Sequence, residues 1–199
     1  KIKVIGMPID PKFFLRESEK EKARENDCLK PKLFTILLMG GGEGAGKMLE
    51  IIEEIERQKL NVQLIVVTGR NKSLETKLKK QCGKFSFPMR VFGFTDQIPE
   101  LMAESDLIVT KAGPGTIAEA MAMGLPIIIT SWLPGQEEGN VEFVVRENVG
   151  RVSQEPNKVV EIIKEMQQPA EFAKFQENIR RVSRPQAAME IAQEIFAHL

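Results

Sequence analysis

The feature that most constrains the fold is a regular alternation of short apolar runs with amphipathic stretches from residue 33 onward. Several of the runs, such as LIVV at 64–67 and PIII at 126–129, are apolar at consecutive positions. Consecutive apolar residues are typical of strands that are covered on both faces. The alternation therefore predicts an α/β fold with a doubly wound, mainly parallel sheet and helices on both faces.

The bounds of the predicted elements follow from where each apolar pattern starts and stops. We expect strands at 33–39, 62–68, 89–92, 107–110, 126–130 and 150–152. We expect helices at 47–58, 73–81, 98–104, 116–123, 140–147 and 159–165, with two further helical patterns in 168–199 that are interrupted near Pro185. Parallel strands place their carboxyl ends on one edge of the sheet, and ligands of such sheets bind at that edge.

Composition excludes several classes of function. Lys+Arg and Asp+Glu both number 28, so no global positive field attracts nucleic acid, and we expect no nucleic-acid partner. Cys28 and Cys82 lie far apart in no metal-like spacing, which favours a reducing compartment. We see no signal peptide and no apolar run long enough to span a membrane. The chain begins at Lys1, so we expect it to be part of a longer protein.

A glycine-rich stretch, GGGEGAGKM at residues 40–48, directly follows the first predicted strand. Such a turn exposes backbone amides to a ligand, often a phosphate. The nucleoside-triphosphatase loop G-x-x-x-x-G-K-[ST] is matched by Gly41, Gly46 and Lys47. Met48, however, stands where a hydroxyl group must bind magnesium, and a thioether is a poor ligand for a hard cation.

The same stretch also matches the dinucleotide fingerprint G-x-G-x-x-G/A through Gly40, Gly42 and Ala45. That fingerprint needs an acidic residue at the end of the second strand, where this chain has Thr68 and Gly69. Two interpretations remain, a tight turn without a ligand and a diphosphate cradle without bound metal. Four glycines within residues 40–44 favour the cradle, because glycine is entropically costly and a turn needs only one or two.

A second glycine turn, TKAGPGTIAEA at residues 110–120, follows another predicted strand and opens a helix. Gly113 and Gly115 let the chain turn sharply, and Pro114 suits the first helical turn. Glu119 lies in an otherwise small and apolar sequence, where its carboxylate is placed to accept hydrogen bonds from a ribose diol. The alternative is that Glu119 is a solvated helix residue, since Glu is usually exposed.

Two more loops follow strands of the same predicted sheet. TSWLPGQEEGN at residues 130–140 carries polar groups suited to the hydroxyls of a hexose, or it is a polar loop whose end caps a helix through Gly139 and Asn140. The segment around Phe92 and Phe94 is suited to hold a flat base by stacking. Its alternative is that both phenylalanines belong to the core.

The segment FGFTDQIPELMAESDLIVTKAGPGTIAEAMAMGLPIIITSWLPGQEEGN closely resembles the donor-binding half of monogalactosyldiacylglycerol synthases and of processive diacylglycerol glucosyltransferases. It is more distantly similar to the N-acetylglucosaminyltransferase that makes lipid II. These are GT-B enzymes with two Rossmann-like domains facing across a cleft. The resemblance extends to GMPIDPKF near the start and to LLMGGGEG. It implies one donor-binding domain over 1–199, with 1–32 as a linker or loop region.

The resemblance also implies a role for each loop in binding UDP-galactose or UDP-glucose, with the sugar nucleotide as a substrate and with no cofactor or metal. Near the diphosphate and the sugar it places Gly41, Gly42, Glu43 and Gly44, with Gly113, Gly115 and Thr116 beside the phosphates. The resemblance places Phe94 and Thr95 at the uracil and Glu119 at the ribose. The donor sugar is then read by Gln136, Glu137 and Asn140.

In such enzymes the acceptor site and the catalytic base lie in an N-terminal domain that this sequence does not include. The only histidine, His198, lies at the C-terminus outside any motif. The chain alone is therefore expected to bind the donor without transferring sugar, and residues 185–199 are expected to pack on the missing domain. The resemblance implies a diacylglycerol acceptor and peripheral membrane contact at a cytoplasmic face, or at the plastid envelope in a plant or alga, with the fragment itself soluble. Transfer to another lipid or polyprenyl acceptor, and a non-catalytic nucleotide-sugar-binding module, remain alternatives.

Overall fold

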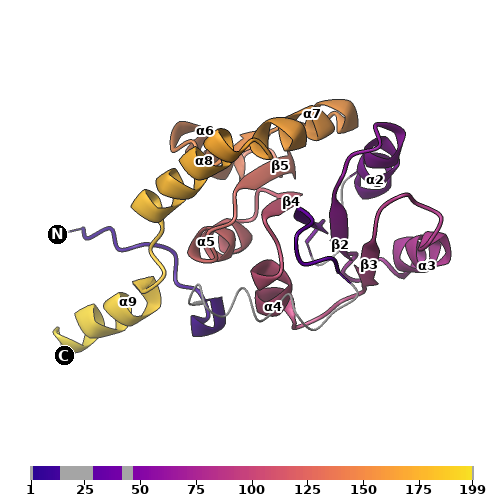
Figure 1. The fold of residues 1–199 in the computed structure, drawn as a ribbon. Coiled ribbons are helices and arrows are strands. Elements are labelled where there is room, and N and C mark those ends of the chain that lie inside the picture. Colours follow the sequence, from indigo (N-terminus) through magenta and orange to yellow (C-terminus); the bar gives the residue numbers. More distant parts are fainter. Residues whose placement is uncertain (1, 14–28, 42–46, 199) are drawn as a thin grey trace.

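The computed structural model describes residues 2–13, 29–41 and 47–198 of the chain (Figure 1). Within these residues six parallel strands form one sheet in the order β3-β2-β1-β4-β5-β6. The predicted doubly wound parallel sheet is thus confirmed. The strands are β1 (Thr35–Met39), β2 (Gln63–Val67), β3 (Met89–Phe92), β4 (Leu107–Lys111), β5 (Ile127–Ser131) and β6 (Gly150–Val152).

The helices follow the strands as the sequence predicts, with small shifts in their ends. They are η1 (Pro11–Phe13), α2 (Met48–Arg57), α3 (Lys72–Gln81), α4 (Ile98–Ala103), α5 (Pro114–Ala122), α6 (Glu138–Arg146), α7 (Pro156–Met166), α8 (Pro169–Val182) and α9 (Ala187–Phe196). The largest shifts are at the starts of α5, α6 and α7. Helices α5 and α7 begin two and three residues earlier than predicted, each on a proline that tolerates the first helical position.

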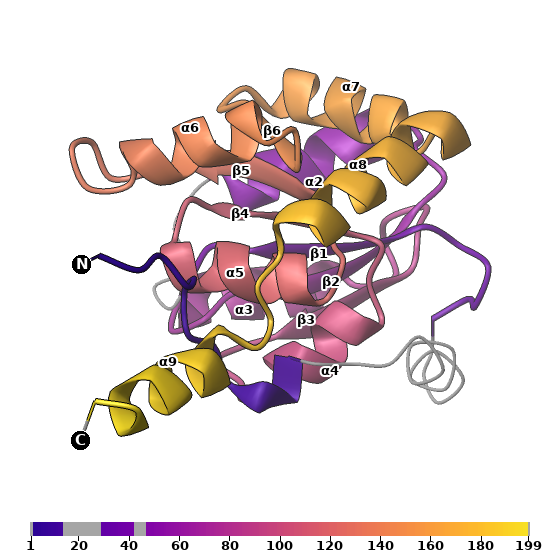
Figure 2. The same cartoon turned by 90° about the vertical axis from the view of Figure 1, so that its left-hand side faces the viewer.

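The helices cover both faces of the sheet (Figure 2). Helices α4, α5 and α6 pack on one face, against alternate strand residues such as Leu37 and Ile108. Helices α2, α3 and α7 pack on the other face, against Leu38 and Val109, while α8 contributes to both clusters. Every residue of β1 and β2 is buried, which accounts for the continuous apolar sequence that follows the first residue of each strand.

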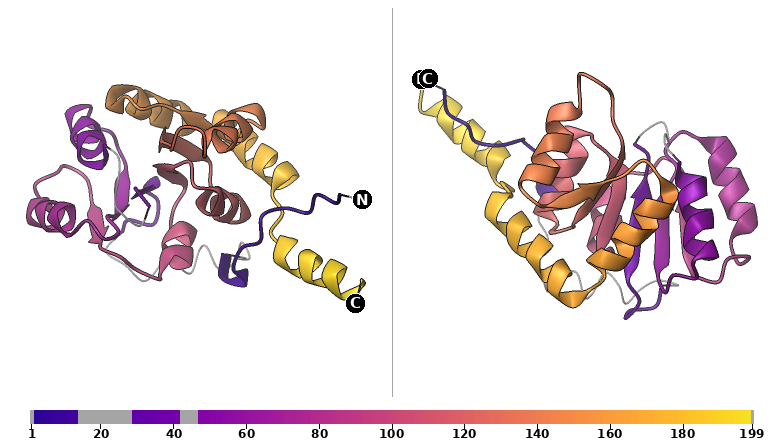
Figure 3. Two further views of the ribbon diagram at one scale, coloured as in Figure 1. Left: turned by 180° about the vertical axis from the view of Figure 1, so that it is seen from behind. Right: turned by 90° about the horizontal axis from the view of Figure 1, so that it is seen from above.

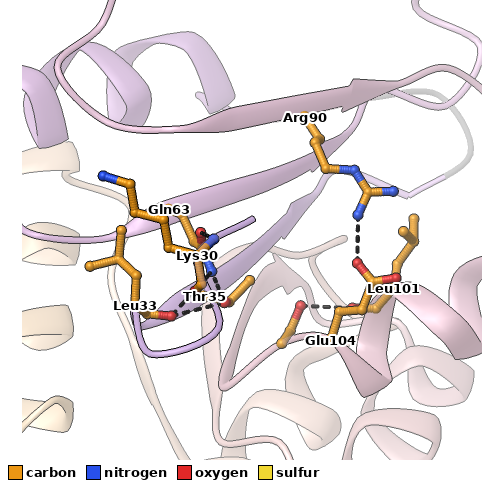
Figure 4. Close-up of polar contacts among 8 residues, drawn as sticks. Lys30, Leu33, Thr35, Gln63, Arg90, Leu101 and Glu104 are labelled. Atoms are coloured by element: carbon orange, nitrogen blue, oxygen red, sulfur yellow. Dashed lines mark hydrogen bonds and ion pairs between the residues drawn. The ribbon is translucent and has the colours of Figure 1, made fainter. Parts of the chain in front are cut away.

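A polar network closes the amino-terminal edge of the sheet (Figure 4). The buried Gln63 side chain donates to Thr35 Oγ1 at 2.7 Å and accepts from the Lys30 N–H at 2.8 Å. Nearby, Arg90 donates to a carboxylate oxygen of Glu104 at 2.6 Å. Protein groups satisfy these polar atoms, so the network stabilises this edge of the sheet.

The N-terminal segment and α9 leave the body of the domain together. Ile9 and Phe13 anchor the segment in the core, but Ile2 is 97% exposed. Helix α9 projects on the same side as the N-terminus (Figures 1 and 3), and Lys3 forms an ion pair with Glu194 of that helix. No helix in the described ranges combines the length and apolar character needed to cross a membrane.

Candidate functional site at the carboxyl edge of the sheet

The strand order places a topological switch point between β1 and β4. The chain continues from β1 toward β2 and from β4 toward β5, so the turns after β1 and β4 diverge and leave a crevice. Gly41, after β1, has a φ of +71°, and a Cβ there would lie 3.0 Å from Lys111 Cε at the end of β4. The two turns that the sequence assigns to phosphate binding are therefore neighbours.

Lys111 connects these turns to the loop after β5. Its Nζ donates to Glu137 Oε1 at 2.9 Å, and the Leu133 N–H donates to Glu137 Oε2 at 2.9 Å. Burial disfavours the charged Glu137 carboxylate, but the bonds from Lys111 and Leu133 outweigh burial and hold its pKa below the usual value. Glu137, which the sequence predicts to contact the donor sugar, is only 6% exposed and is paired with Lys111 and Leu133.

Sequence reasoning missed Lys111 as a member of the site. The residue lies at a register shift between Thr110 and Lys111 in the pairing of β4 with β5. Its one signal in the sequence is its position, directly between a buried strand and the AGPG turn. A lysine at a strand end is ordinarily a solvated residue, so that signal alone does not indicate a functional role.

Helix α5 begins at the edge of this crevice. Pro114 is its first residue and Gly113 its N-cap, with no side chain capping the first-turn amides. Gly115 and Thr116 are partly exposed there. Unpaired amides at a helix N-terminus favour an anion. The structure thus brings Gly113, Gly115 and Thr116 together beside Gly41 and Lys111.

Glu119 lies one turn further along α5. Its side chain is partly buried, and Oε1 lies 4.0 Å from the position of a Cβ at Gly115. Within the described ranges no hydrogen bond or ion pair to this carboxylate is found, and burial together with the nearby Asp10 raises its pKa. Glu119 is therefore not a fully solvated helix residue but a partly buried carboxylate on α5 that has no hydrogen-bond or ion-pair partner among the described residues.

The loop after β5 differs from one interpretation of the sequence. Helix α6 begins at Glu138 with Glu137 as its N-cap, so the prediction that Gly139 and Asn140 cap it is wrong. Asn140 lies inside the first turn, where its Nδ2 donates to Ala112 O at 2.8 Å. This bond ties α6 to the turn after β4. Gln136 is exposed on the same loop and remains available to a ligand.

The two phenylalanines after β3 have different surroundings. Phe92 is partly buried against the core, in line with the core interpretation for that residue. Phe94 is 68% exposed, and the Arg70 guanidinium carbon lies 5.1 Å from its ring centroid. Thr95 is partly exposed, and its Oγ1 accepts from the Gln97 N–H at 3.2 Å. The ring of Phe94 is thus presented at the same edge as the glycine turns.

Some residues predicted from the sequence cannot be placed or have other roles. Gly42, Glu43 and Gly44 lie outside the described residues, as does Cys28. Met48, the first residue of α2, is 2% exposed and packs in the core. His198 is exposed at the end of α9, where its Nδ1 lies 2.8 Å from Glu194 O. The described ranges contain no cluster of three or more His, Cys, Asp or Glu residues arranged to hold a metal ion.

A cavity of about 730 Å³ adjoins the crevice. It lies between the N-terminal segment, α5, α6 and α8, and its lining includes Pro114 and Asn140. Most of its other lining residues are apolar, among them Ile117, Met121 and Phe143. Of the residues that the sequence predicts for the site, Asn140 lines this cavity, whereas Gly41, Glu119 and Glu137 do not.

Comparisons with known proteins bear on this arrangement. Residues 35–195 match the glycosyltransferase family 28 C-terminal domain. Monogalactosyldiacylglycerol synthase 3, chloroplastic, from Arabidopsis thaliana is 38% identical over 98% of this chain and 43% of its own length. Probable monogalactosyldiacylglycerol synthase 2, chloroplastic, from Oryza sativa subsp. japonica is 35% identical over 98% and 43%. The chain therefore spans less than half the length of these relatives.

Two solved structures share the fold at low sequence identity. MurG of Acinetobacter baumannii has a TM-score of 0.71 and 17% identity, covering 89% of this chain and 53% of its own. HepE of Anabaena, crystallised with UDP and glucose, has a TM-score of 0.70 and 20% identity, covering 97% and 56%. The family match and the identity to the plant enzymes together show that this chain belongs to the glycosyltransferase family 28 C-terminal domain family.

Proposed function

We propose that this chain is the donor-binding half of a glycosyltransferase that moves a hexose from UDP-galactose or UDP-glucose to diacylglycerol. The observation that carries this proposal is the 35–38% identity to monogalactosyldiacylglycerol synthases over 98% of the chain. The contacts among the loops after β1, β4 and β5 at the β1/β4 switch point support it, because nucleotides bind parallel sheets at this position. HepE, which shares the fold, was crystallised with UDP-glucose.

The proposed donor pose follows from the chemistry of each loop. The diphosphate lies between Gly41 and the first turn of α5, which contributes Gly113, Gly115 and Thr116, and the sequence assigns Gly42, Glu43 and Gly44 to the same ligand. The Glu119 carboxylate accepts hydrogen bonds from the ribose hydroxyls. The uracil stacks on the exposed Phe94 and meets Thr95, and the hexose lies against Gln136, Glu137 and Asn140.

We propose that no metal bridges the diphosphate. The backbone amides of the glycine turns and the positive end of the α5 dipole stabilise the charge of the UDP leaving group instead. A base supplied by another part of the protein removes the proton from a diacylglycerol hydroxyl, and that oxygen attacks the anomeric carbon of the sugar. Attack from the face opposite UDP inverts that carbon and gives a β-linked glycolipid.

The exposed apolar residues at both ends of the chain support a second domain. On α9, Met189, Ile195 and Phe196 are between 56% and 77% exposed, and Val4 is 92% exposed. We propose that 185–199 packs on a preceding acceptor domain, that 1–32 links the two domains, and that 1–199 forms the donor domain. The acceptor domain then makes the peripheral membrane contact at a cytoplasmic face, or at the plastid envelope if the source is a plant or alga.

Isothermal titration of the chain with UDP, UDP-galactose, UDP-glucose and NADH tests the proposal. We expect UDP and at least one UDP-hexose to bind, with no detectable binding of NADH. Magnesium and EDTA should leave the UDP affinity unchanged. Binding of NADH in preference to UDP would overturn the proposal. Comparison of the two UDP-hexoses decides which donor is used, and an assay with diacylglycerol tests the expectation that the chain alone transfers no sugar.

A further inference from the structure

Lys111 occupies the junction of three loops. Its methylene carbons lie against Gly41, where a Cβ would approach Cε and Cδ to 3.0 and 3.2 Å. They also lie near Gly113, where a Cβ would be 3.6 Å from Cε and 3.9 Å from Nζ. Because both neighbours are glycines, no side chain separates the ammonium group from the backbone of either turn. The ammonium group is therefore within reach of an anion held by these turns.

The partner of Lys111 is held by a second bond. Glu137 Oε1 accepts from Lys111, but Oε2 accepts from the Leu133 N–H within the same loop. The carboxylate is thus anchored independently of the lysine. The Lys111 side chain is 34% exposed and the Glu137 side chain 8% exposed, so the lysine has room to turn toward the crevice while the glutamate stays in place.

A bound diphosphate changes the balance of charges at this junction. A diphosphate carries more negative charge than one carboxylate, and lysine presents three donors on a flexible stem. Its arrival beside Gly41 and Gly113 offers the ammonium group a stronger partner than Glu137. Release of Glu137 leaves a nearly buried carboxylate with one oxygen unpaired, which costs free energy unless another donor replaces the lysine.

We infer that Lys111 and Glu137 form a charge switch, in which the donor diphosphate draws Lys111 away from Glu137 and frees that carboxylate to accept a hydroxyl of the donor sugar. This inference rests on the proposed function and adds a mechanism to it. The sugar-reading carboxylate becomes available only when a diphosphate is present. The site then distinguishes nucleoside diphosphates from monophosphates, because a monophosphate such as UMP lacks the β-phosphate that opens the pair.

Titration calorimetry with UDP, UMP and a UDP-hexose tests the switch in two variants. Lys111→Met should weaken UDP binding about 10-fold or more, the scale of a lost charge-assisted hydrogen bond, and UMP binding less than about 3-fold. Lys158→Met is the matched control, because Lys158 on α7 forms an exposed ion pair with Glu155, the N-cap of that helix, and its loss should change neither affinity. Glu137→Gln should tighten UDP binding by about 2- to 5-fold, because it removes the competitor for Lys111.

The UDP-hexose supplies the second half of the test. In Glu137→Gln the gain in affinity that the hexose adds over UDP should fall, because a neutral amide oxygen accepts a hydrogen bond from a sugar hydroxyl more weakly than a carboxylate does. Equal weakening of UDP and UMP by Lys111→Met would overturn the switch, as would unchanged UDP affinity or weaker UDP binding in Glu137→Gln. If Lys111→Met does not fold, Glu137→Gln decides alone. Failure of the unaltered chain to bind UDP would instead overturn the proposed function, and the switch with it.

Discussion

The carboxylate of Glu119, which has no hydrogen-bond or ion-pair partner among the described residues, allows effects on ligand binding and on stability to be separated. Glu119→Gln keeps the size of the side chain and removes its charge. In the folded protein, burial and the neighbouring Asp10 raise the pKa of Glu119 above its ordinary value of 4.5. The folded state therefore holds more protons than the unfolded state just above pH 4.5, and the free energy of unfolding falls as pH rises through that window.

Glu119→Gln has no carboxylate at this position and so lacks this fall in the free energy of unfolding. At neutral pH the variant should therefore be at least as stable as the parent chain. The gain is on the order of a few tenths to about 1 kcal/mol, the range for partly exposed charge interactions. For a chain of this size that corresponds to a rise in Tm of at most about 2–4 °C. UDP binding should change in the opposite sense. Hydrogen bonds to a charged acceptor are worth about 1 kcal/mol more than neutral ones, so Glu119→Gln should weaken UDP binding about 5- to 30-fold.

Two measurements check this pair of effects. Thermal unfolding of both proteins between about pH 4 and pH 8 should show the parent losing stability relative to the variant as pH rises through the carboxyl range. Titration with UDP at neutral pH gives the binding loss, and Glu119→Ala should show a loss of roughly 1–3 kcal/mol. Glu161→Gln, an exposed change on α7, is the control. A less stable Glu119→Gln variant, or one with undiminished UDP affinity, would refute the reasoning.

Four further perturbations have definite expected outcomes. Phe94→Ala should weaken UDP binding, as measured by titration. The same variant should change the free energy of unfolding in urea by no more than about 0.5 kcal/mol, because the ring is 68% exposed. Gly41→Ala, at a φ of +71° and with its Cβ 3.0 Å from Lys111 Cε, should cost about 1 kcal/mol in urea unfolding and weaken UDP binding. Leu37→Ala, at a fully buried site in β1, should cost about 2–5 kcal/mol in the same assay. Glu137 has a lowered pKa, so its stabilising effect is lost as pH falls through the folded-state value, and Glu137→Gln should flatten the acid side of the stability profile.

Elements with uninterrupted apolar patterns could be predicted from the sequence, because burial on both faces leaves little choice of residue type. β3 was predicted with its observed bounds, since Pro88 and Gly93 punctuate it on either side. The start of α7 was placed three residues late because its apolar pattern begins at Val159, whereas the backbone turns helical at Pro156. Apolar periodicity reports which residues are buried and not where the backbone first becomes helical.

The position of the glycine turns on one edge of the sheet could be predicted from the sequence, because turns that follow parallel strands lie on the same edge. The hydrogen bonds between different loops could not be predicted from the sequence in the same way. The bond from Lys111 to Glu137 joins residues 26 positions apart, and Asn140 reaches Ala112 O, 28 positions away, instead of capping its own helix. The lack of a partner at Glu119 likewise depends on what packs around it. Local sequence describes the backbone of each turn, whereas the partners of these side chains depend on tertiary packing.

A crystal structure of this chain with UDP tests the central claim most directly. We predict that the diphosphate lies between the turn at Gly41 and the first turn of α5, with the ribose hydroxyls on Glu119 and the Lys111 ammonium group on a phosphate oxygen. UDP bound in the 730 Å³ cavity between α5, α6 and α8, or anywhere that leaves Glu119 without a contact, would contradict the account.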